Sequence, residues 1–366
     1  MLEPDAPAHP VWMELDLGAL AGNYAEIRRR FGPDGKVIAA IKANAYGNSA
    51  VDVARTLGDL GVYALATASF ADALAVRRAG IDARLLMFGG PLPAAMPDLL
   101  RHGLIPTVYN MDLAQAVSAA AAAPTPVYVK VDTGMGRLGV PVERARAFIL
   151  DIAGLPNIAV EGVYTHASFF EADDAALSRQ RIAAFDALLA DLAAAGLEVP
   201  VTQAIASSSL LAGITSTANA ICPGHLLYGV SSVAPGVGDM TGFRPVLGEI
   251  GARLIHVGHP AGRPDKTVGV VPIGFYQGYR NPLAGAPAVM LFRGQRVPVT
   301  GVSLEYTKLD LTGIDAPGLG EEVIVIGERD GESIRLEDVG AWQGARAHEV
   351  LMAFDQRLPC RVRAAD

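Results

Sequence analysis

Short apolar runs alternate with longer, alanine-rich amphipathic stretches through the first two thirds of the chain. An apolar run bounded by turn residues predicts a buried strand, and the stretches that follow predict helices. We expect strands at residues 37–42, 60–66, 85–88, 126–131, 159–164 and 201–206, and long helices at 142–150 and 178–195. Strands that are apolar throughout and are each followed by a helix are typical of a parallel sheet buried on both faces.

The number of strand–helix units indicates the fold class. Roughly eight units within roughly 230 residues predict an α/β fold with an N-terminal (β/α)₈ TIM-like barrel. A doubly wound sheet is the structural alternative, but no Gly-x-Gly-x-x-Gly sequence opens the first helix.

The pattern changes after Met240, where Gly, Pro and Asp turns separate runs typical of strands. We expect strands at residues 246–257, 267–273, 288–292, 295–302, 308–311 and 322–326, and short helices at 337–339 and 348–352. This indicates a C-terminal, mostly β domain. The Gly/Pro/Ser-rich segment 231–242 predicts the boundary. We expect a barrel domain over residues 1–235, whose first residues can pair with the C-terminal domain, and a β domain over 236–366.

Composition excludes several classes of protein. A chain of 366 residues that is 51% hydrophobic and 19% charged is compact and globular, and it is long enough for two domains. The net charge of −8 disfavours nucleic acid and anionic membranes as partners. Cys222 and Cys360 are far apart in sequence, which predicts thiols in a reducing, cytoplasmic compartment. The first residues show no signal peptide, and no apolar stretch is long enough to span a bilayer.

Lys42 follows the apolar run at 37–41, at the expected carboxyl end of a strand. Catalytic residues of such barrels lie at the carboxyl ends of the strands. Desolvation there lowers the pKa of a lysine and favours Schiff-base chemistry. The alternative is an ordinary solvated lysine at a strand end.

The neighbours of Lys42 and five further motifs extend the pattern along the chain. They are Trp12-Met-Glu-Leu-Asp-Leu-Gly-Ala-Leu, Lys42-Ala-Asn-Ala-Tyr-Gly, Lys130-Val-Asp-Thr-Gly-Met-Gly-Arg-Leu-Gly, Thr165-His166, Ser207–Ser209 with Pro223-Gly-His-Leu-Leu-Tyr-Gly, and Val271-Pro-Ile-Gly-Phe with Glu349-Val-Leu. In type, spacing and order this set resembles the alanine racemase family, the fold-type III enzymes that depend on pyridoxal 5′-phosphate (PLP). The resemblance covers nearly the whole chain.

The resemblance implies roles for individual residues, with PLP as the cofactor. Lys42 matches the lysine that binds PLP as a Schiff base and moves a proton on one face of the substrate. The cofactor-binding candidates are Lys42, Tyr46, Arg137, His166, Ser208, Gly224 and His225. Among these, Arg137 matches the arginine directed at the phenolic oxygen of PLP. Tyr46, Ser208 and the backbone at Gly224 and His225 match phosphate ligands. Lys130 matches a lysine that is often carbamylated.

Each candidate also has a simpler interpretation. A buried tyrosine such as Tyr46 or Tyr228 is often a core residue with a satisfied hydroxyl. A single histidine such as His166 is more often structural than catalytic. Arg137 alternatively pairs with Asp132 or with a helix-end carbonyl. Ser207–Ser209 alternatively form a helix N-cap.

The sequence departs from the family where the second proton-transfer residue is expected. The family uses a tyrosine from the partner subunit on the substrate face opposite the lysine, but residues 256–274 contain no tyrosine. Tyr306 is the leading substitute, because the resemblance places its loop at the partner's active site. Glu305, Tyr276 and Tyr279 follow, and a packed interface aromatic is the alternative for Tyr306.

Further departures lie around the cofactor ring and the substrate. Cys222 stands where the family has an arginine at the pyridine nitrogen, and a neutral thiol is a weak hydrogen-bond donor. Leu304-Glu305-Tyr306 replaces the family's Cys-Met-Asp, Asn48 replaces a histidine, and Gln356 replaces a late tyrosine.

We expect a cytoplasmic PLP-dependent racemase that interconverts the L and D forms of a small amino acid. The catalytic residues expected are Lys42 and Tyr306, and the resemblance implies a homodimer whose subunits share each active site. Another PLP reaction at Cα or Cβ, such as epimerisation, retro-aldol cleavage or elimination, is the alternative, as is a PLP-binding protein without activity.

Overall fold

The computed structural model describes residues 9–89, 91–354 and 358–363. The chain forms two compact units. The barrel unit contains Leu20–Ala45 and Ser49–Arg244. The β-rich unit contains the described residues up to Ala19, the short segment Tyr46–Asn48, and those from Pro245 onward. The expectations for the first seven residues and for Gln356 concern positions outside the described ranges.

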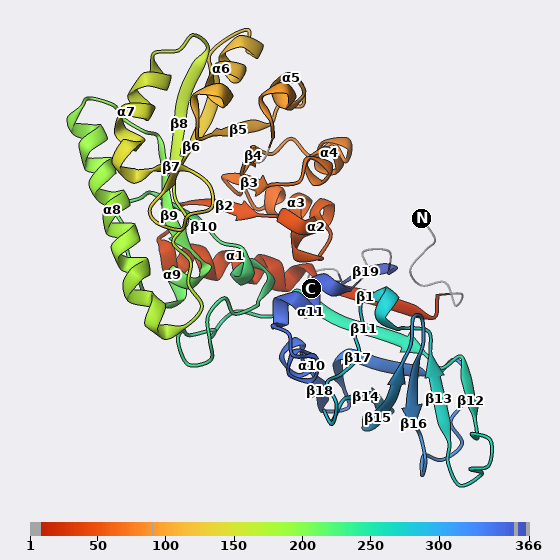
Figure 1. Cartoon of the computed structure of the whole chain (residues 1–366). Coiled ribbons are helices and arrows are strands. Elements are labelled where there is room, and N and C mark those ends of the chain that lie inside the picture. Colours follow the sequence, from red (N-terminus) through yellow and green to blue (C-terminus); the bar gives the residue numbers. More distant parts are fainter. Residues whose placement is uncertain (1–8, 90, 355–357, 364–366) are drawn as a thin grey trace. The chain divides into compact units, whose positions relative to one another are not determined.

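Eight parallel strands of the barrel unit close into a cylinder, which confirms the predicted (β/α)₈ barrel (Figure 1). They are β2 (Lys36–Ala40), β3 (Ala64–Thr67), β4 (Leu85–Met87), β5 (Ile105–Val108), β6 (Thr125–Asp132), β8 (Ile158–Tyr164), β9 (Val201–Ala206) and β10 (Ala220–Cys222). The strand order is β5-β4-β3-β2-β10-β9-β8-β6, and β5 pairs with β6 to close the ring. A short ninth strand, β7 (Val140–Pro141), pairs with β6.

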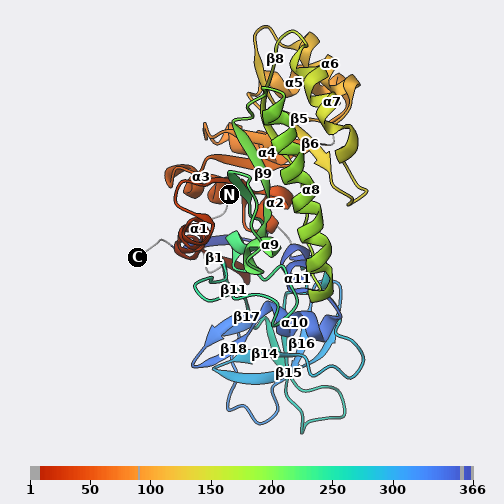
Figure 2. The same ribbon diagram turned by 90° about the vertical axis from the view of Figure 1, so that its left-hand side faces the viewer.

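Helices connect the strands on the outside of the barrel. They are α1 (Leu17–Phe31), α3 (Ala50–Asp59), α4 (Phe70–Arg78), α5 (Met96–Arg101), α6 (Met111–Ala120), α7 (Val142–Ala153), α8 (Ala175–Ala194) and α9 (Ser207–Leu211). Polar side chains cap several of them, because the first N–H groups of a helix have no partner within it. Ser49, Ser69 and Asn110 accept such N–H groups at the starts of α3, α4 and α6. The longest helix, α8, runs along the barrel wall in Figure 2.

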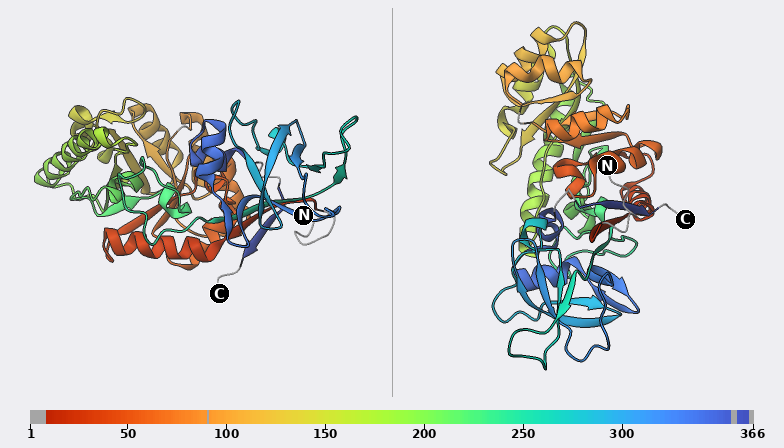
Figure 3. Two further views of the ribbon diagram at one scale, coloured as in Figure 1. Left: turned by 90° about the horizontal axis from the view of Figure 1, so that it is seen from below. Right: turned by 90° about the vertical axis from the view of Figure 1, so that its right-hand side faces the viewer.

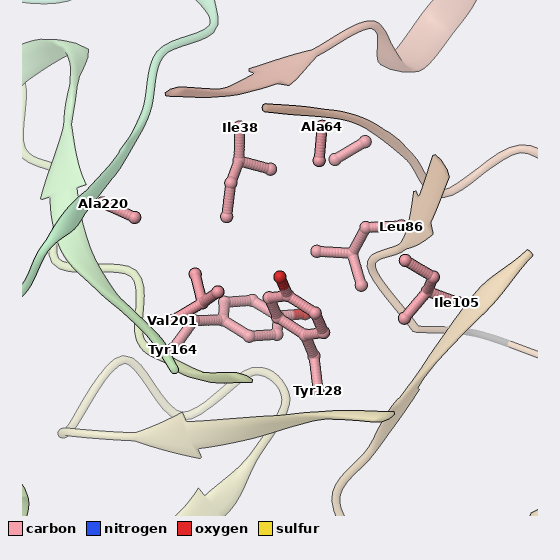
Figure 4. Close-up of a cluster of buried hydrophobic side chains, with 9 residues drawn as sticks. Ile38, Ala64, Leu86, Ile105, Tyr128, Tyr164, Val201 and Ala220 are labelled. Carbon is pink, nitrogen blue, oxygen red and sulfur yellow. The ribbon is translucent and has the colours of Figure 1, made fainter. Parts of the chain in front are cut away.

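Side chains that point inward fill the barrel (Figure 4). Ile38, Ala64, Leu86, Ile105, Tyr128, Tyr164, Val201 and Ala220 meet in one buried cluster. Small and aliphatic residues on some strands leave room for the two tyrosine rings from β6 and β8. The interior is therefore a packed core that supports the mouth of the barrel and is not a channel.

The β-rich unit is built on one mostly antiparallel sheet (Figure 3). Its strands are β1 (Val11–Asp16), β11 (Leu247–Arg253), β12 (His256–Gly258), β13 (Val268–Val271), β14 (Val289–Phe292), β15 (Gln295–Val302), β16 (Thr307–Asp310), β17 (Glu322–Arg329), β18 (Glu332–Ile334) and β19 (Cys360–Arg363). The order is β12-β13-β16-β15-β14-β17-β11-β1-β19, with β18 paired to β17. Two helices, α10 (Leu336–Gln343) and α11 (Ala347–Ala353), complete the unit.

Some predicted element bounds were wrong. The single strand expected at 246–257 is broken between Arg253 and His256 into β11 and β12. Leu60 and Gly61 end helix α3 through backbone bonds to Thr56 and Gly58, so β3 begins at Ala64 and not at residue 60. The hydrophobic pattern cannot show where α3 ends and β3 begins, because the residues on both sides of this boundary are apolar. In the described part of the chain, no helix combines the length and apolar character needed to cross a bilayer.

Candidate functional site

The carboxyl ends of β2, β6, β8, β9 and β10 bring most of the predicted site residues to one end of the barrel unit. Lys42 follows β2 after Ile41, whose N–H bonds to Ala66 on β3 at 2.8 Å. Ala40 is held twice: its N–H bonds to Pro223 at 3.0 Å, and its carbonyl accepts the Tyr228 hydroxyl at 2.8 Å. Tyr228 is thus a buried tyrosine with a satisfied hydroxyl, as its simpler interpretation states. The backbone that leads into Lys42 is fixed by its neighbours on both sides.

The Lys42 side chain retains accessible surface, but surrounding protein still desolvates its ammonium. This desolvation lowers the pKa of Lys42. The nearby Arg137 charge lowers the pKa further, whereas Cys222 acts in the opposite direction. A lysine with a lowered pKa holds more neutral amine at neutral pH, and the neutral amine is the nucleophile for Schiff-base formation.

The chain turns in a left-handed sense directly after Lys42. In segment α2 (Lys42–Tyr46), Ala43, Asn44 and Ala45 have φ values of 53°, 50° and 55°, and Tyr46 has φ 55°. The N–H of Ala45 bonds to the carbonyl of Ile41 at 2.9 Å, which closes the turn around Lys42. L-residues other than glycine and asparagine rarely adopt this conformation, and a run of four is unusual. The turn is therefore a strained element placed beside the candidate catalytic lysine.

The loop after β6 carries Arg137 and is organised by Asp132. The Asp132 carboxylate accepts the N–H groups of Gly134, Met135 and Gly136 at 3.0, 2.7 and 2.9 Å. Burial would raise the pKa of Asp132, but these three donors outweigh it and lower the pKa. The hydrogen bonds of this carboxylate thus go to its own loop. Arg137 is exposed, and its charge still reaches Lys42 and Lys130.

Lys130 lies on β6, below the loop, and is buried. Its Nζ donates to the carbonyl of Val131 at 2.7 Å and lies 5.4 Å from the centre of the Tyr164 ring. Desolvation lowers the pKa of Lys130 to about 8. A buried lysine with this pKa carries a substantial neutral fraction at mildly basic pH.

His166 follows β8, and its Nε2 lies 2.8 Å from the Ser168 hydroxyl. Burial lowers the pKa of His166 to about 3. Lys42, Lys130, Arg137 and His225 act on the pKa of His166 in the same direction as burial. His166 is therefore neutral at physiological pH, and each of these four basic residues lies close enough to its ring to affect it.

Backbone N–H groups converge where β9 and β10 end. The Ser207 hydroxyl accepts N–H groups from Gly224 at 3.0 Å and Leu226 at 3.4 Å. The Ser208 hydroxyl accepts the N–H of Phe169 at 3.3 Å, and Ser209 Oγ is buried with no hydrogen-bond partner among the described residues. The N-cap of α9 is Ala206, which makes no side-chain cap bond, so the serines do not act as the simple N-cap of the alternative.

Cys222 ends β10 beside Lys42 and packs against the barrel cluster. Burial raises the pKa of its thiol to about 12, although the Lys42 charge acts to lower it. The thiol is therefore protonated at physiological pH. A neutral, weakly donating group stands at this position.

Tyr306 lies in the β-rich unit, in the turn between β15 and β16, with 47% of its surface exposed. The turn is bonded to the segment at 275–277: the N–H groups of Phe275 and Tyr276 bond to the carbonyls of Ser303 and Leu304 at 3.1 and 2.8 Å. Four large exposed side chains, which we term the aromatic patch, gather on this pair of segments: Phe275, Tyr276, Leu304 and Tyr306. By contrast, Tyr279 is buried.

Within the barrel unit, the structure brings together six predicted residues: Lys42, Arg137, His166, Ser208, Gly224 and His225. Tyr46 and Tyr306 belong to the β-rich unit. Sequence reasoning missed Ser168, which bonds to His166, and Asp72, which bonds to the turn after Lys42. An acidic residue in the first turn of the helix after the neighbouring strand was the available signal for Asp72.

Comparisons with known proteins point to the same family in both the N-terminal and the C-terminal parts of the chain. Residues 15–232 match the alanine racemase N-terminal domain family, and residues 259–362 match the alanine racemase C-terminal domain family. Among curated proteins, the alanine racemase of Desulfovibrio desulfuricans is 31% identical over 96% of this chain and 97% of its own. The alanine racemase of Thermodesulfovibrio yellowstonii is 32% identical over 94% of this chain and 95% of its own.

Solved structures give the same result. The Clostridium difficile alanine racemase complex with cycloserine superimposes with a TM-score of 0.87 at 25% identity, over 97% of this chain and 96% of the other. The biosynthetic alanine racemase of Pseudomonas aeruginosa gives a TM-score of 0.81 at 26% identity, over 97% of this chain and 100% of the other.

Proposed function

The chain belongs to the alanine racemase family, and from this premise we propose that it is a PLP-dependent racemase of a small amino acid. The observation that carries the proposal is Lys42, a desolvated lysine with a lowered pKa at the carboxyl end of β2. Full-length relatives and structural neighbours named alanine racemase support the racemase over other PLP reactions.

The residues at the mouth of the barrel fit PLP. The cofactor carries a phosphate and a phenolic oxygen, both anionic, and the basic residues Lys42, Lys130, Arg137 and His225 all lie close enough to His166 to affect its pKa. The nearby carboxylate, Asp132, is bonded to three backbone N–H groups of its own loop. The hydroxyl of Ser209, which has no hydrogen-bond partner among the described residues, offers a donor for a phosphate.

We assign Lys42 as the residue that binds PLP covalently, Arg137 to its phenolic oxygen, and Tyr46, Ser208, Gly224 and His225 to its phosphate. His166, kept neutral by its surroundings, would lie beside the ring. Bound in this way, PLP supplies an electron sink that makes the Cα proton of the substrate acidic. Cys222 would stand at the pyridine nitrogen, as the family resemblance implies, and its neutral thiol would offer that nitrogen no charged partner.

The chain's own residues move the proton. The Lys42 amine has a lowered pKa, so its Nζ can accept a proton from one face of Cα and return it. Inversion needs a second acid or base on the opposite face. We assign this role to Tyr306, because no tyrosine lies in the loop between β12 and β13 and Tyr306 stands exposed on the aromatic patch.

The aromatic patch supports a homodimer. Four large apolar or aromatic side chains exposed together are typical of a surface that another protein covers. We propose that a second copy of this chain covers the patch and that Tyr306 of the partner subunit completes each barrel site. We also place the enzyme in the cytoplasm, which agrees with two cysteines that form no disulfide, and we expect no nucleic-acid or membrane partner.

A pair of variants tests the proposal. In heavy water, the protein with PLP should convert L-alanine into deuterated D-alanine, and Tyr306→Phe should reduce conversion by about a hundredfold or more, in the range of lost general acid–base catalysis. Tyr276→Phe, in the same patch, is the matched control and should keep activity. Exchange of the Cα proton without inversion in the unaltered protein would exclude racemisation, and full activity in Tyr306→Phe would remove Tyr306 as the second base.

A further inference from the structure

The left-handed turn after Lys42 needs a restraint that holds it. Ala43, Asn44, Ala45 and Tyr46 each have φ near 50°, and each non-glycine residue in this region costs about 1–2 kcal/mol. Such a conformation persists only where surrounding bonds outweigh its cost. The bond from Ala45 to Ile41 closes the turn but does not tie it to the rest of the barrel.

Asp72 ties the turn to helix α4. Its carboxylate accepts the N–H of Asn44, the second residue after Lys42, at 3.0 Å. Asp72 lies in the first turn of α4, and its own N–H is capped by the Ser69 hydroxyl at 3.1 Å. The hydrogen bond from Ser69 fixes the backbone that carries the Asp72 carboxylate. This backbone belongs to the segment that follows β3, and β3 is the strand next to β2.

Asn44 also links the turn to the helix that follows it. Its side-chain Oδ1 accepts the N–H of Ala50 at 2.7 Å, at the start of α3. The residue that Asp72 holds by its backbone thus holds the following helix by its side chain. Asparagine tolerates the left-handed region better than other non-glycine residues, so the most restrained position of the turn carries the best-suited residue.

We propose that Asp72 is a positioning residue for Lys42. The bond to Asn44 fixes the left-handed turn, and the turn fixes the direction in which the Lys42 side chain leaves the end of β2. Asp72 contacts the turn at the backbone N–H of Asn44, so it acts on Lys42 through the geometry of the backbone. This inference rests on the proposed role of Lys42 as the PLP-binding base.

Three substitutions separate geometry from charge. Asp72→Ala removes the acceptor, Asp72→Asn keeps an acceptor oxygen of the same shape without the charge, and Asp72→Glu keeps the charge but moves the carboxylate by one methylene. Asp112→Ala is the matched control, because Asp112 is an acidic residue in the first turn of another barrel helix, α6. It controls for the loss of a favourable charge at a helix start.

The first readout needs neither cofactor nor turnover. Hydrogen–deuterium exchange of the peptide covering residues 41–50 should be faster in Asp72→Ala and Asp72→Glu than in the unaltered protein. Asp72→Asn and Asp112→Ala should keep the original protection. Unchanged exchange in both Asp72→Ala and Asp72→Glu would overturn the proposal, and Asp72→Glu serves for this test if Asp72→Ala does not fold.

The second readout follows Lys42 itself. In Asp72→Ala, the pH midpoint of the PLP–lysine absorbance band should shift and kcat should fall by about tenfold to a hundredfold, as for a misplaced catalytic group, with a smaller change in KM. Asp72→Asn should restore both values. An unchanged band, midpoint and kcat in Asp72→Ala, or no rescue by Asp72→Asn, would overturn the proposal. Absence of the band in the unaltered protein would instead contradict the proposed function.

Discussion

Lys42 and Cys222 stand at the carboxyl ends of two neighbouring barrel strands, β2 and β10, and each side chain shifts the pKa of the other. For the thiol, burial outweighs the Lys42 charge and raises the pKa to about 12. The pair therefore combines a lysine that loses its proton easily with a thiol that keeps its proton. Lys42 is thus the reactive member of the pair.

The first prediction concerns thiol reactivity. At pH 8, a thiol with a pKa of about 12 is ionised in only about one molecule in ten thousand, and the thiolate is the nucleophile. Both cysteines are half-buried. Because the pKa of Cys222 is raised, iodoacetamide should leave Cys222 intact in the folded protein and alkylate it once the protein is unfolded, with Cys360 as the reference thiol. Peptide mass spectrometry measures both sites in one sample. Modification of Cys222 as fast as Cys360 would contradict the raised pKa of this thiol.

The second prediction concerns stability and pH. The pKa of Lys130 is about 8 in the folded protein against 10.5 for a free lysine, so the unfolded chain binds more protons between these values. Stability should therefore rise as the pH increases from about 8 to about 10.5, by up to about 3 kcal/mol, and the buried charge should cost a constant amount below pH 8. Urea denaturation of the protein freed of cofactor measures this rise.

A matched pair of variants isolates the contribution of Lys130. Lys130→Met should reduce the rise between pH 8 and 10.5, to which Lys42 also contributes because its pKa is lowered too. Lys308→Met, at an exposed lysine of the β-rich unit, should keep the full rise. Equal slopes in Lys130→Met and the unaltered protein would show that another group causes the effect.

The third prediction concerns the left-handed turn. Ala43 has φ 53°, a conformation that glycine adopts without the clash of a Cβ atom. Ala43→Gly should therefore leave stability unchanged or raise it, by at most about 1 kcal/mol. Ala187→Gly, at an exposed site inside α8, should lower stability by about 1 kcal/mol, as glycine does in an ordinary helix. Equal losses in the two variants would contradict the left-handed conformation.

Much of the barrel could be predicted from sequence, because its strands are buried on both faces and read as continuous apolar runs. β9 was expected at residues 201–206, and it occupies Val201–Ala206. The short strands β5 and β10 were not predicted, since Pro106 and Thr107 interrupt the apolar run of β5, and β10 has only three residues between Asn219 and Pro223. Their positions follow from the closed pairing of the barrel, which is a property of the whole sheet.

The candidate site was likewise only partly predictable from the sequence. Motifs identified Lys42, Arg137 and His166, which lie at strand ends in the barrel unit as expected. Sequence could not show that Ser207, and not Ser208, accepts the N–H groups of Gly224 and Leu226, since three adjacent serines are equivalent in a sequence. Nor could it show the left-handed turn, because alanine at 43 and 45 ordinarily favours a right-handed helix.

The most direct test of the account is to locate the lysine that binds PLP. Incubation with PLP, reduction with sodium borohydride and peptide mass spectrometry fix the cofactor on the lysine to which it was joined. We predict a single pyridoxyl group on the peptide that contains Lys42, and its loss in Lys42→Ala together with the absorbance band. A pyridoxyl group on another lysine, or an unchanged band in Lys42→Ala, would contradict the central claim.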